Sequence, residues 1–132
     1  MKNQLLALIL MAVTTNAEAE WTLFDSKEGV KNYYIDLNTI RKEGNAAKVW
    51  TMISYEAVES TSEGKLYTSA KDLWIFDCKR DTGYIASINY YDGSMGKGDF
   101  VDSVNINEKK SGDPIVPGTT LEWIFKKACN KK

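Results

Sequence analysis

Short runs in which apolar and polar residues alternate dominate the chain after residue 20. They cover residues 21–24, 33–37, 48–55, 66–76, 84–90 and 100–106 and are rich in aromatic and β-branched side chains, as is typical of β-strands. Residues 38–42 fit either one helical turn or an extended segment. Polar turns separate the runs, and no helical pattern comes between them. The pattern therefore predicts hairpin connections and an antiparallel sheet.

Three of these runs indicate how the strands are buried. Residues 48–55 carry bulky side chains on both faces, which predicts a central strand covered on both sides. Residues 84–90 alternate cleanly, so one face is expected to carry Tyr84, Ala86, Ile88 and Tyr90. In residues 66–76, the face that continues to Cys78 in the period-two alternation carries Ala70, Asp72, Trp74 and Phe76. Asp72 interrupts this apolar side, and we expect a β-bulge there.

The last part of the chain changes to helical spacing. Thr119 lies three residues before Glu122, the arrangement of a capping box, in which each side chain hydrogen-bonds the other residue's backbone amide. The apolar positions form one stripe, made of Leu121, Ile124, Phe125 and Ala128, with Cys129 at its edge. Trp123 faces elsewhere and is expected to pack under a loop. The pattern predicts a C-terminal helix with one buried face.

The first residues have the three-part pattern of a secretory signal peptide. Lys2 precedes an apolar run over residues 5–13, and Ala17-Glu18-Ala19 places small residues where a signal peptidase reads. A membrane anchor would need about 20 apolar residues. We expect cleavage after Ala19, which leaves one domain over residues 20–132. A lipoprotein would need a cysteine directly after the cleavage site, so we expect a soluble protein in the periplasm, at the cell surface or outside the cell.

Export also decides how the cysteines are interpreted. Thiols pair in an oxidising compartment, and Cys78 with Cys129 is the one intramolecular bridge available. A redox pair is disfavoured because there is no C-x-x-C motif, and two thiolates alone make a poor metal site. The sequence predicts a disulfide that ties the C-terminal helix to the sheet face carrying Trp74 and Phe76.

Composition and charge exclude several functions. The 132 residues contain no histidine, which removes histidine-based triads, the usual zinc sites and haem ligation by histidine. A net charge of −1 argues against a general nucleic-acid binder. Carboxylate pairs such as Asp72 with Asp77, or Asp99 with Asp102, are the catalytic arrangement left open, and solvated surface acids are the favoured interpretation. The glycines of residues 93–98 fit no phosphate-binding motif and indicate an irregular hairpin. We expect no catalytic residue, no cofactor and no bound metal.

Pairs of basic residues fall on predicted turns and at the end of the chain. They are Lys79-Arg80, Lys109-Lys110, Lys126-Lys127 and Lys131-Lys132. Exposed charges of this kind steer protein partners, although solubility is their commonest role. The candidate partner-binding residues are Lys79, Arg80, Lys109, Lys110, Lys131 and Lys132.

An ordered set of motifs resembles a known family. The motifs are Trp21, Tyr34-Ile35-Asp36 with Ile40 and Gly44, Val49-Trp50, Tyr67-x-Ser69-x-Lys71, Phe76-Asp77-Cys78, Met95-Gly96-x-Gly98, Pro117-Gly118-Thr119 and Cys129. Together they resemble the bacterial surface-adhesin protein E family over nearly all of the mature chain. The resemblance implies an α+β fold, in which a six-stranded antiparallel sheet carries a C-terminal helix tied to it by the disulfide. It also implies binding to host matrix or serum proteins, with a homodimer as one option.

Two further functions stay open beside a host-protein binder. One is a periplasmic accessory or structural protein without host contact, and an enzyme is the more distant one. The sequence ends in Asn130-Lys131-Lys132, so that an ammonium group lies beside the terminal carboxylate. Kringle domains of plasminogen recognise this pairing, which makes Lys131 and Lys132 candidates for serum-protein capture. A solvated tail is the alternative.

Overall fold

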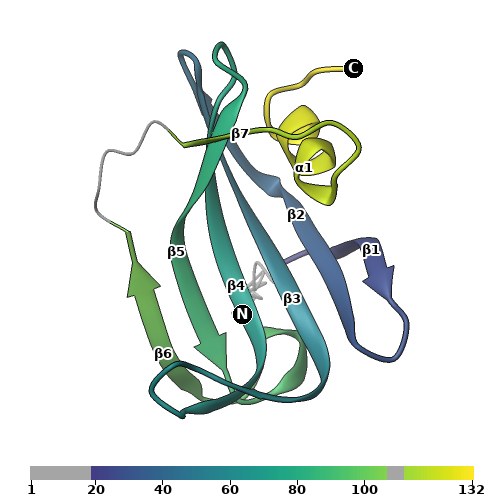
Figure 1. The fold of residues 1–132 in the computed structure, drawn as a ribbon, viewed down its shortest axis with the longest axis vertical. Coiled ribbons are helices and arrows are strands. Elements are labelled where there is room, and N and C mark those ends of the chain that lie inside the picture. Colours follow the sequence, from purple (N-terminus) through teal and green to yellow (C-terminus); the bar gives the residue numbers. More distant parts are fainter. Residues whose placement is uncertain (1–18, 107–111) are drawn as a thin grey trace, which may run out of the picture.

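The computed structural model describes residues 19–106 and 112–132, which form one antiparallel sheet and one helix (Figure 1). The strands are β1 (Thr22–Lys27), β2 (Lys31–Glu43), β3 (Ala46–Ser60), β4 (Leu66–Asp77), β5 (Thr82–Tyr91), β6 (Phe100–Asn105) and the two-residue β7 (Asp113–Pro114). A 3₁₀ turn, η1 (Ser94–Gly96), follows β5, and the helix α1 (Thr120–Ala128) comes last. The sheet order is β1-β2-β3-β4-β5-β6, and β7 pairs with β5. The predicted antiparallel sheet of six consecutive strands with a C-terminal helix is confirmed.

Strand β2 includes residues 38–42, the segment whose sequence fitted either a helical turn or an extended conformation. Its pairing with β3 shifts between Asp36 and Arg41, so the ladder is interrupted there. The Thr39 hydroxyl group donates to the Asp36 carbonyl (2.7 Å) and accepts from the backbone N–H of Trp50 (3.0 Å). These bonds replace missing ladder bonds, so the chain stays extended instead of forming a helical turn.

One of the register shifts in the sheet is a bulge in β5, beside the position expected from Asp72. Leu73 pairs with Ser87 and Trp74 pairs with Ile85, so Ala86 is the extra residue. The expectation that Tyr84, Ala86, Ile88 and Tyr90 share one face is therefore wrong. One inserted residue reverses the alternation, so Ile85 joins Ile88 and Tyr90 on the helix side while Tyr84 faces the other way.

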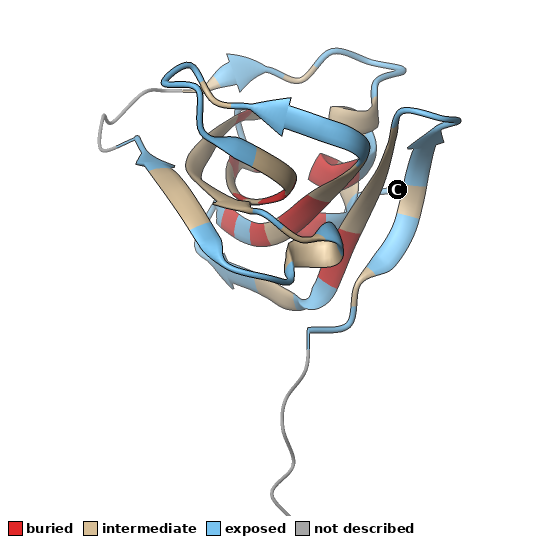
Figure 2. Ribbon diagram, turned by 90° about the horizontal axis from the view of Figure 1, so that it is seen from below, coloured by how far each residue is buried: buried red, intermediate tan, exposed pale blue. Residues whose placement is uncertain are grey.

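The hydrophobic core lies between α1 and the concave face of the curled sheet (Figure 2). Its buried members are Ile35, Ala47, Val49, Phe76, Cys78, Ile124, Phe125, Ala128 and Cys129. The ring of Phe76 lies at its centre, stacked on Trp74 (5.7 Å between centroids) and edge-on to Phe125 (5.6 Å). The face that carries Trp74 and Phe76 is therefore the one covered by the helix, as predicted.

Strand β3 is buried on both faces, as its sequence indicates. Val49 faces α1, whereas Met52 faces the opposite side, and both are fully buried. On that opposite side the chain around η1 packs against β4. The Ser69 hydroxyl group donates to the Gly93 carbonyl (2.6 Å) and accepts from the backbone N–H of Gly96 (2.8 Å). The glycine-rich stretch is thus an irregular connection that covers the second face.

The start of α1 uses the predicted capping pattern with one change. Thr119 Oγ1 accepts from the backbone N–H of Glu122 (3.2 Å), and Glu122 Oε1 accepts from Gly118 rather than from Thr119 (3.3 Å). Trp123 lies outside the apolar stripe and stacks on Phe24 of β1, with the ring centroids 4.7 Å apart. The helix is therefore attached to the edge strand as well as to the core.

Candidate protein-binding site

The turn between β4 and β5 presents two of the predicted basic residues. Asp77 Oδ1 accepts from the backbone N–H groups of Lys79 and Arg80, both at 3.0 Å. Asp81 follows with φ of +53°, a conformation that aspartate tolerates better than most residues. An aspartate that bonds the amides after it is a common way to close a tight turn. The backbone of this turn is fixed by the bonds, while both basic side chains stay exposed.

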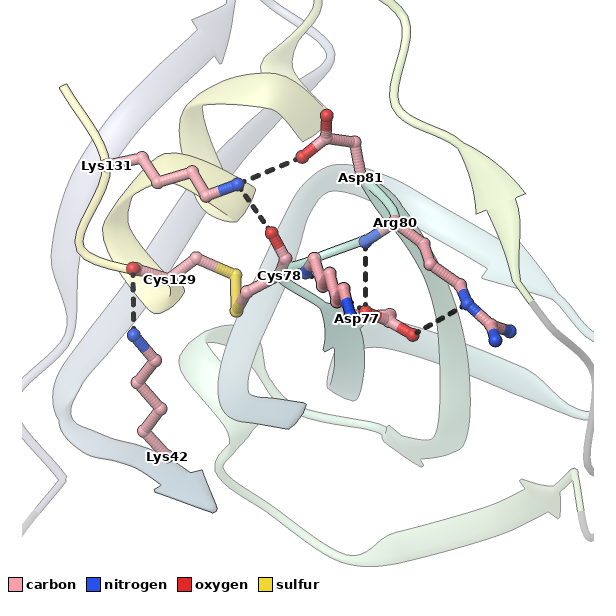
Figure 3. A network of polar contacts seen from close by, with 8 residues as sticks. Lys42, Asp77, Cys78, Arg80, Asp81, Cys129 and Lys131 are labelled. Carbon is pink, nitrogen blue, oxygen red and sulfur yellow. Dashed lines mark hydrogen bonds and ion pairs between the residues drawn. A yellow bond between two sulfur atoms is a disulfide. The ribbon is translucent and has the colours of Figure 1, made fainter. Parts of the chain in front are cut away.

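The disulfide bond joins this turn to the end of α1 (Figure 3). Cys78 follows directly after β4 and Cys129 is the C-terminal cap of the helix, with their Cα atoms 5.6 Å apart. Both residues are buried. The backbone N–H of Cys78 donates to the Asn45 carbonyl (2.7 Å), and Lys42 Nζ donates to the Cys129 carbonyl (3.4 Å). The predicted bridge is confirmed, and the β2–β3 turn is connected to it.

Lys131 forms a second connection at the same place. Its ammonium group donates to the Cys78 carbonyl and to Asp81 Oδ1, the latter at 3.0 Å, and lies 5.1 Å from the centroid of the Phe125 ring. The pair with Asp81 is partly exposed, because the side chains keep 41% and 64% of their accessible surface. The segment after the helix is therefore attached to the β4–β5 turn.

Four of the six candidate residues thus belong to one end of the domain, which we call the basic end: Lys79, Arg80, Lys131 and Lys132. Figure 3 shows Arg80 and Lys131 on either side of the disulfide. Arg80 Nε lies 3.9 Å from Asp77 Oδ2 and its side chain is 74% exposed, whereas the Lys131 ammonium group is engaged within the domain. Lys132 is exposed. Lys109 and Lys110 lie outside the described residues.

The remaining basic pair, Lys126 and Lys127, lies on α1 and contacts other side chains of the same helix. Lys126 Nζ lies 3.5 Å from Glu122 Oε1, and Lys127 Nζ lies 5.3 Å from the centroid of the Trp123 ring. The first is an i,i+4 ion pair and the second a cation–π contact, and both are common on exposed helix surfaces. These two lysines therefore contribute to the surface of α1 more than to the basic end.

Two surface hollows flank the β4–β5 turn. One, of about 280 Å³, lies against α1 and is lined by Asp81, Ile115, Pro117, Glu122, Phe125, Lys126, Lys131 and Lys132. The other, of about 400 Å³, is lined by Glu43, Asn45, Ala46, Ile75, Phe76, Asp77, Arg80, Thr82 and Tyr84. Each hollow combines charged side chains with apolar surface. The basic end therefore offers shape and apolar contact in addition to charge.

Asp72 and Asp77, one of the carboxylate pairs considered from the sequence, do not form an acid–base site. Asp72 and Asp77 stand an odd number of positions apart in a regular stretch of β4, so they face opposite sides of the sheet. Asp102 pairs with Lys65 (3.1 Å), and this hydrogen bond lowers the pKa of Asp102. No group of three or more Cys, Asp or Glu side chains suited to a metal ion occurs in residues 19–106 and 112–132.

Sequence reasoning missed two residues of this region. Lys42 of β2 donates to the Cys129 carbonyl, 87 residues away in sequence, and Asp81 accepts from Lys131, 50 residues away. No local pattern marks such contacts. The Asp-Thr-Gly sequence after Arg80 indicates a turn, which is the one signal that pointed to Asp81.

The fold and the basic end together define a small disulfide-bonded α+β domain with an exposed basic surface. The chain belongs to the surface-adhesin protein E family, whose model matches residues 21–130. Its fold is similar to that of protein E from non-typeable Haemophilus influenzae, with a TM-score of 0.53, 17% sequence identity and 86% of each chain covered. A comparison with curated proteins found no match.

Family membership indicates an adhesin-like protein that is exported or located at a surface and has protein partners. In the part of the chain that the structure describes, no helix has the length and apolar character needed to cross a membrane.

Proposed function

We propose that this chain is an exported binding protein that captures a host matrix or serum protein through the basic end. The observation that carries the proposal is the placement of Lys79, Arg80, Lys131 and Lys132 on two segments that the Cys78–Cys129 bond holds together. Family membership supports a protein partner. The partner surface would be acidic, because it meets two exposed basic side chains on the turn and a third at Lys132.

Charge alone would not hold such a complex. An exposed ion pair contributes about 0 to 1 kcal/mol, so the basic side chains mainly increase the association rate and select the partner. The larger contribution would come from apolar contact, which the hollow beside Phe125, Ile115 and Pro117 provides. A partner side chain inserted there would lie next to Lys132 and to the engaged Lys131.

The proposal is tested by reversing charge at the turn. Purified Lys79→Glu/Arg80→Glu protein and the unaltered protein are used to capture partners from serum and from a bacterial envelope extract, and the captured protein is then titrated by biolayer interferometry. We expect at least a tenfold loss of affinity, mostly in the association rate, with the loss shrinking at high salt.

The matched control is Lys27→Glu/Lys97→Glu, which changes the net charge equally on exposed residues at the opposite end of the sheet. It should bind like the unaltered protein. Equal losses in both double variants would mean that only net charge matters, and an unchanged affinity in the first would remove the basic end from the binding site.

The same experiment separates host capture from a role within the envelope. A partner captured from serum supports the adhesin proposal, whereas capture from envelope extract alone supports a periplasmic accessory role. Antibody labelling of intact and permeabilised cells adds a second criterion, because a host-binding protein must be accessible from outside. We also propose that residues 1–19 are a signal peptide. The intact mass of the exported protein should correspond to a chain that begins at Glu20.

A further inference from the structure

A cavity of about 210 Å³ lies between α1 and the concave face of the sheet, away from the basic end. Its walls come from strands β1 to β5 and from the helix, and they are mostly apolar. Phe24, Tyr33 and Trp74 contribute aromatic rings, and Leu121 closes it from α1. Among the described residues that line it, Asp72 is the one that carries a charge. Small-molecule sites commonly combine apolar walls with a few polar groups in this way.

Asp72 is buried, and one oxygen of its carboxylate lacks a hydrogen-bond partner among the described residues. The residue is 5% exposed, and its Oδ1 atom has no donor within reach among the described residues. Trp74 Nε1, two residues along β4, donates to Thr51 Oγ1 (3.1 Å), the residue that pairs with Asp72 across β3, and not to Asp72. Nearly all buried polar atoms in proteins are hydrogen-bonded, so an exception calls for an explanation. A ligand that donates a hydrogen bond to Oδ1 is such an explanation.

The surroundings of Asp72 favour a cationic donor. The rings of Tyr55, Tyr67 and Tyr90 pack together on the same side of the sheet. Burial raises the pKa of all three hydroxyl groups, and the charge of Asp72 raises it further. Lys31 is the nearby cation on β2, and its ammonium group lies over the rings of Tyr33 and Tyr55 instead of pairing with Asp72. Aromatic rings therefore line the same cavity as this carboxylate, and no countercharge pairs with it among the described residues.

We propose that this cavity binds a small arylalkyl amine, whose ammonium group pairs with Asp72 and whose ring lies against Phe24, Trp74 and Leu121. The size fits, since an apolar cavity of about 150 Å³ holds benzene. A volume of about 210 Å³ leaves room for a ring with a short aminoalkyl arm. The aromatic walls also attract the cation through their π faces. This site is independent of the basic end and does not rest on the proposed function.

The test is an NMR titration of the ¹⁵N-labelled protein near neutral pH with three ligands of the same shape: benzylamine, benzyl alcohol and benzoate. We expect benzylamine to shift the signals of Thr51, Trp74 and Leu121 and to bind about tenfold or more tightly than benzyl alcohol, with no binding of benzoate. In the Asp72→Asn variant, benzylamine should lose this advantage while benzyl alcohol binds as before.

Two further variants complete the experiment. Asp99→Asn removes an exposed carboxylate with the same change in net charge and should leave benzylamine binding unaltered. Leu121→Phe fills the cavity without touching Asp72 and should weaken all ligands, so it tests the site even if Asp72→Asn folds poorly. Equal binding of amine and alcohol, an equal effect of Asp99→Asn, or shifts confined to the surface would each overturn the proposal.

Discussion

The ammonium group of Lys131 lies 3.0 Å from the Asp81 carboxylate, so a non-covalent bond runs beside the disulfide between the same two segments. The two connections span nearly equal distances in sequence, 50 and 51 residues. The disulfide fixes how far apart the segments are, and the Lys131 bonds fix how the tail is oriented over the turn. Such an arrangement holds the basic end in one geometry.

The Lys131–Asp81 pair should contribute little to stability. In Asp81→Asn the ion pair is lost, and asparagine accepts the positive φ of this position. Because both side chains are partly exposed, we expect the free energy of unfolding to fall by less than about 1 kcal/mol. Urea denaturation measures the fall, with Asp99→Asn as the control. A loss above about 2 kcal/mol would contradict a solvent-screened pair.

Removal of the disulfide should have a much larger effect. The bond closes a loop of 51 residues, for which chain entropy gives roughly 4 kcal/mol of stabilisation. We expect urea denaturation in the presence of a reductant to show a loss of that order. Alkylation of the native protein followed by intact mass measurement should find no free thiol. Two alkylated cysteines in unreduced protein would show that the bridge is absent.

The stability of the protein should fall as the pH rises toward neutrality because of Asp72. Burial raises the pKa of this carboxyl from 3.8 to about 7, so the folded state binds the proton more tightly than the unfolded state. The contribution of Asp72 to stability is fully present below the pKa of the unfolded state, 3.8. It declines as the pH rises and is fully lost above about 7. The upper limit of the loss is about 4 kcal/mol.

The ionisable groups around Asp72 with shifted pKa values stay outside this range. Burial raises the pKa of the Tyr55, Tyr67 and Tyr90 hydroxyl groups, and the hydrogen bond from Lys65 lowers the pKa of Asp102 on β6. Denaturation of Asp72→Asn between about pH 5 and about pH 8 should therefore give a nearly constant stability, higher than that of the unaltered protein at the upper end. Parallel pH profiles for the two proteins would contradict this account.

Replacing Gly83 should destabilise the core. This residue is buried opposite Phe76, and a Cβ atom there would overlap the Phe76 ring. The ring is held between Trp74 and Phe125 and cannot move away freely. We expect Gly83→Ala to lower the unfolding free energy by about 1 to 3 kcal/mol, measured by urea denaturation.

The control for this substitution is Gly29→Ala, which adds a methyl group where no atom lies within 4 Å and tests only the positive φ. It should cost about 1 kcal/mol. A Gly83→Ala protein as stable as the unaltered one would show that the packing around Phe76 is loose.

Local patterns predicted the sheet, the helix and the disulfide because each depends on neighbouring residues or on a single possible pairing. They could not locate the bulge, because Ala86 is selected by the register between β4 and β5 and not by its own chemistry. The role of Lys131 was hidden for a similar reason. A terminal lysine in isolation is expected to be solvated, and its bonds depend on Asp81 being brought close by the fold. The cavity was equally hidden, although the apolar neighbours of Asp72 marked that residue as unusual.

The sequential order of the strands also determines when parts of the molecule become complete during export. Each of β1 to β6 pairs with its neighbour in sequence, so hairpins can close as the chain emerges amino end first. The thiol of Cys78 emerges 51 residues before its partner, after four strands are already available to pair. Until Cys129 arrives, that thiol is open to mixed disulfides with other molecules. The maturation of this small domain therefore depends on the arrival of Cys129.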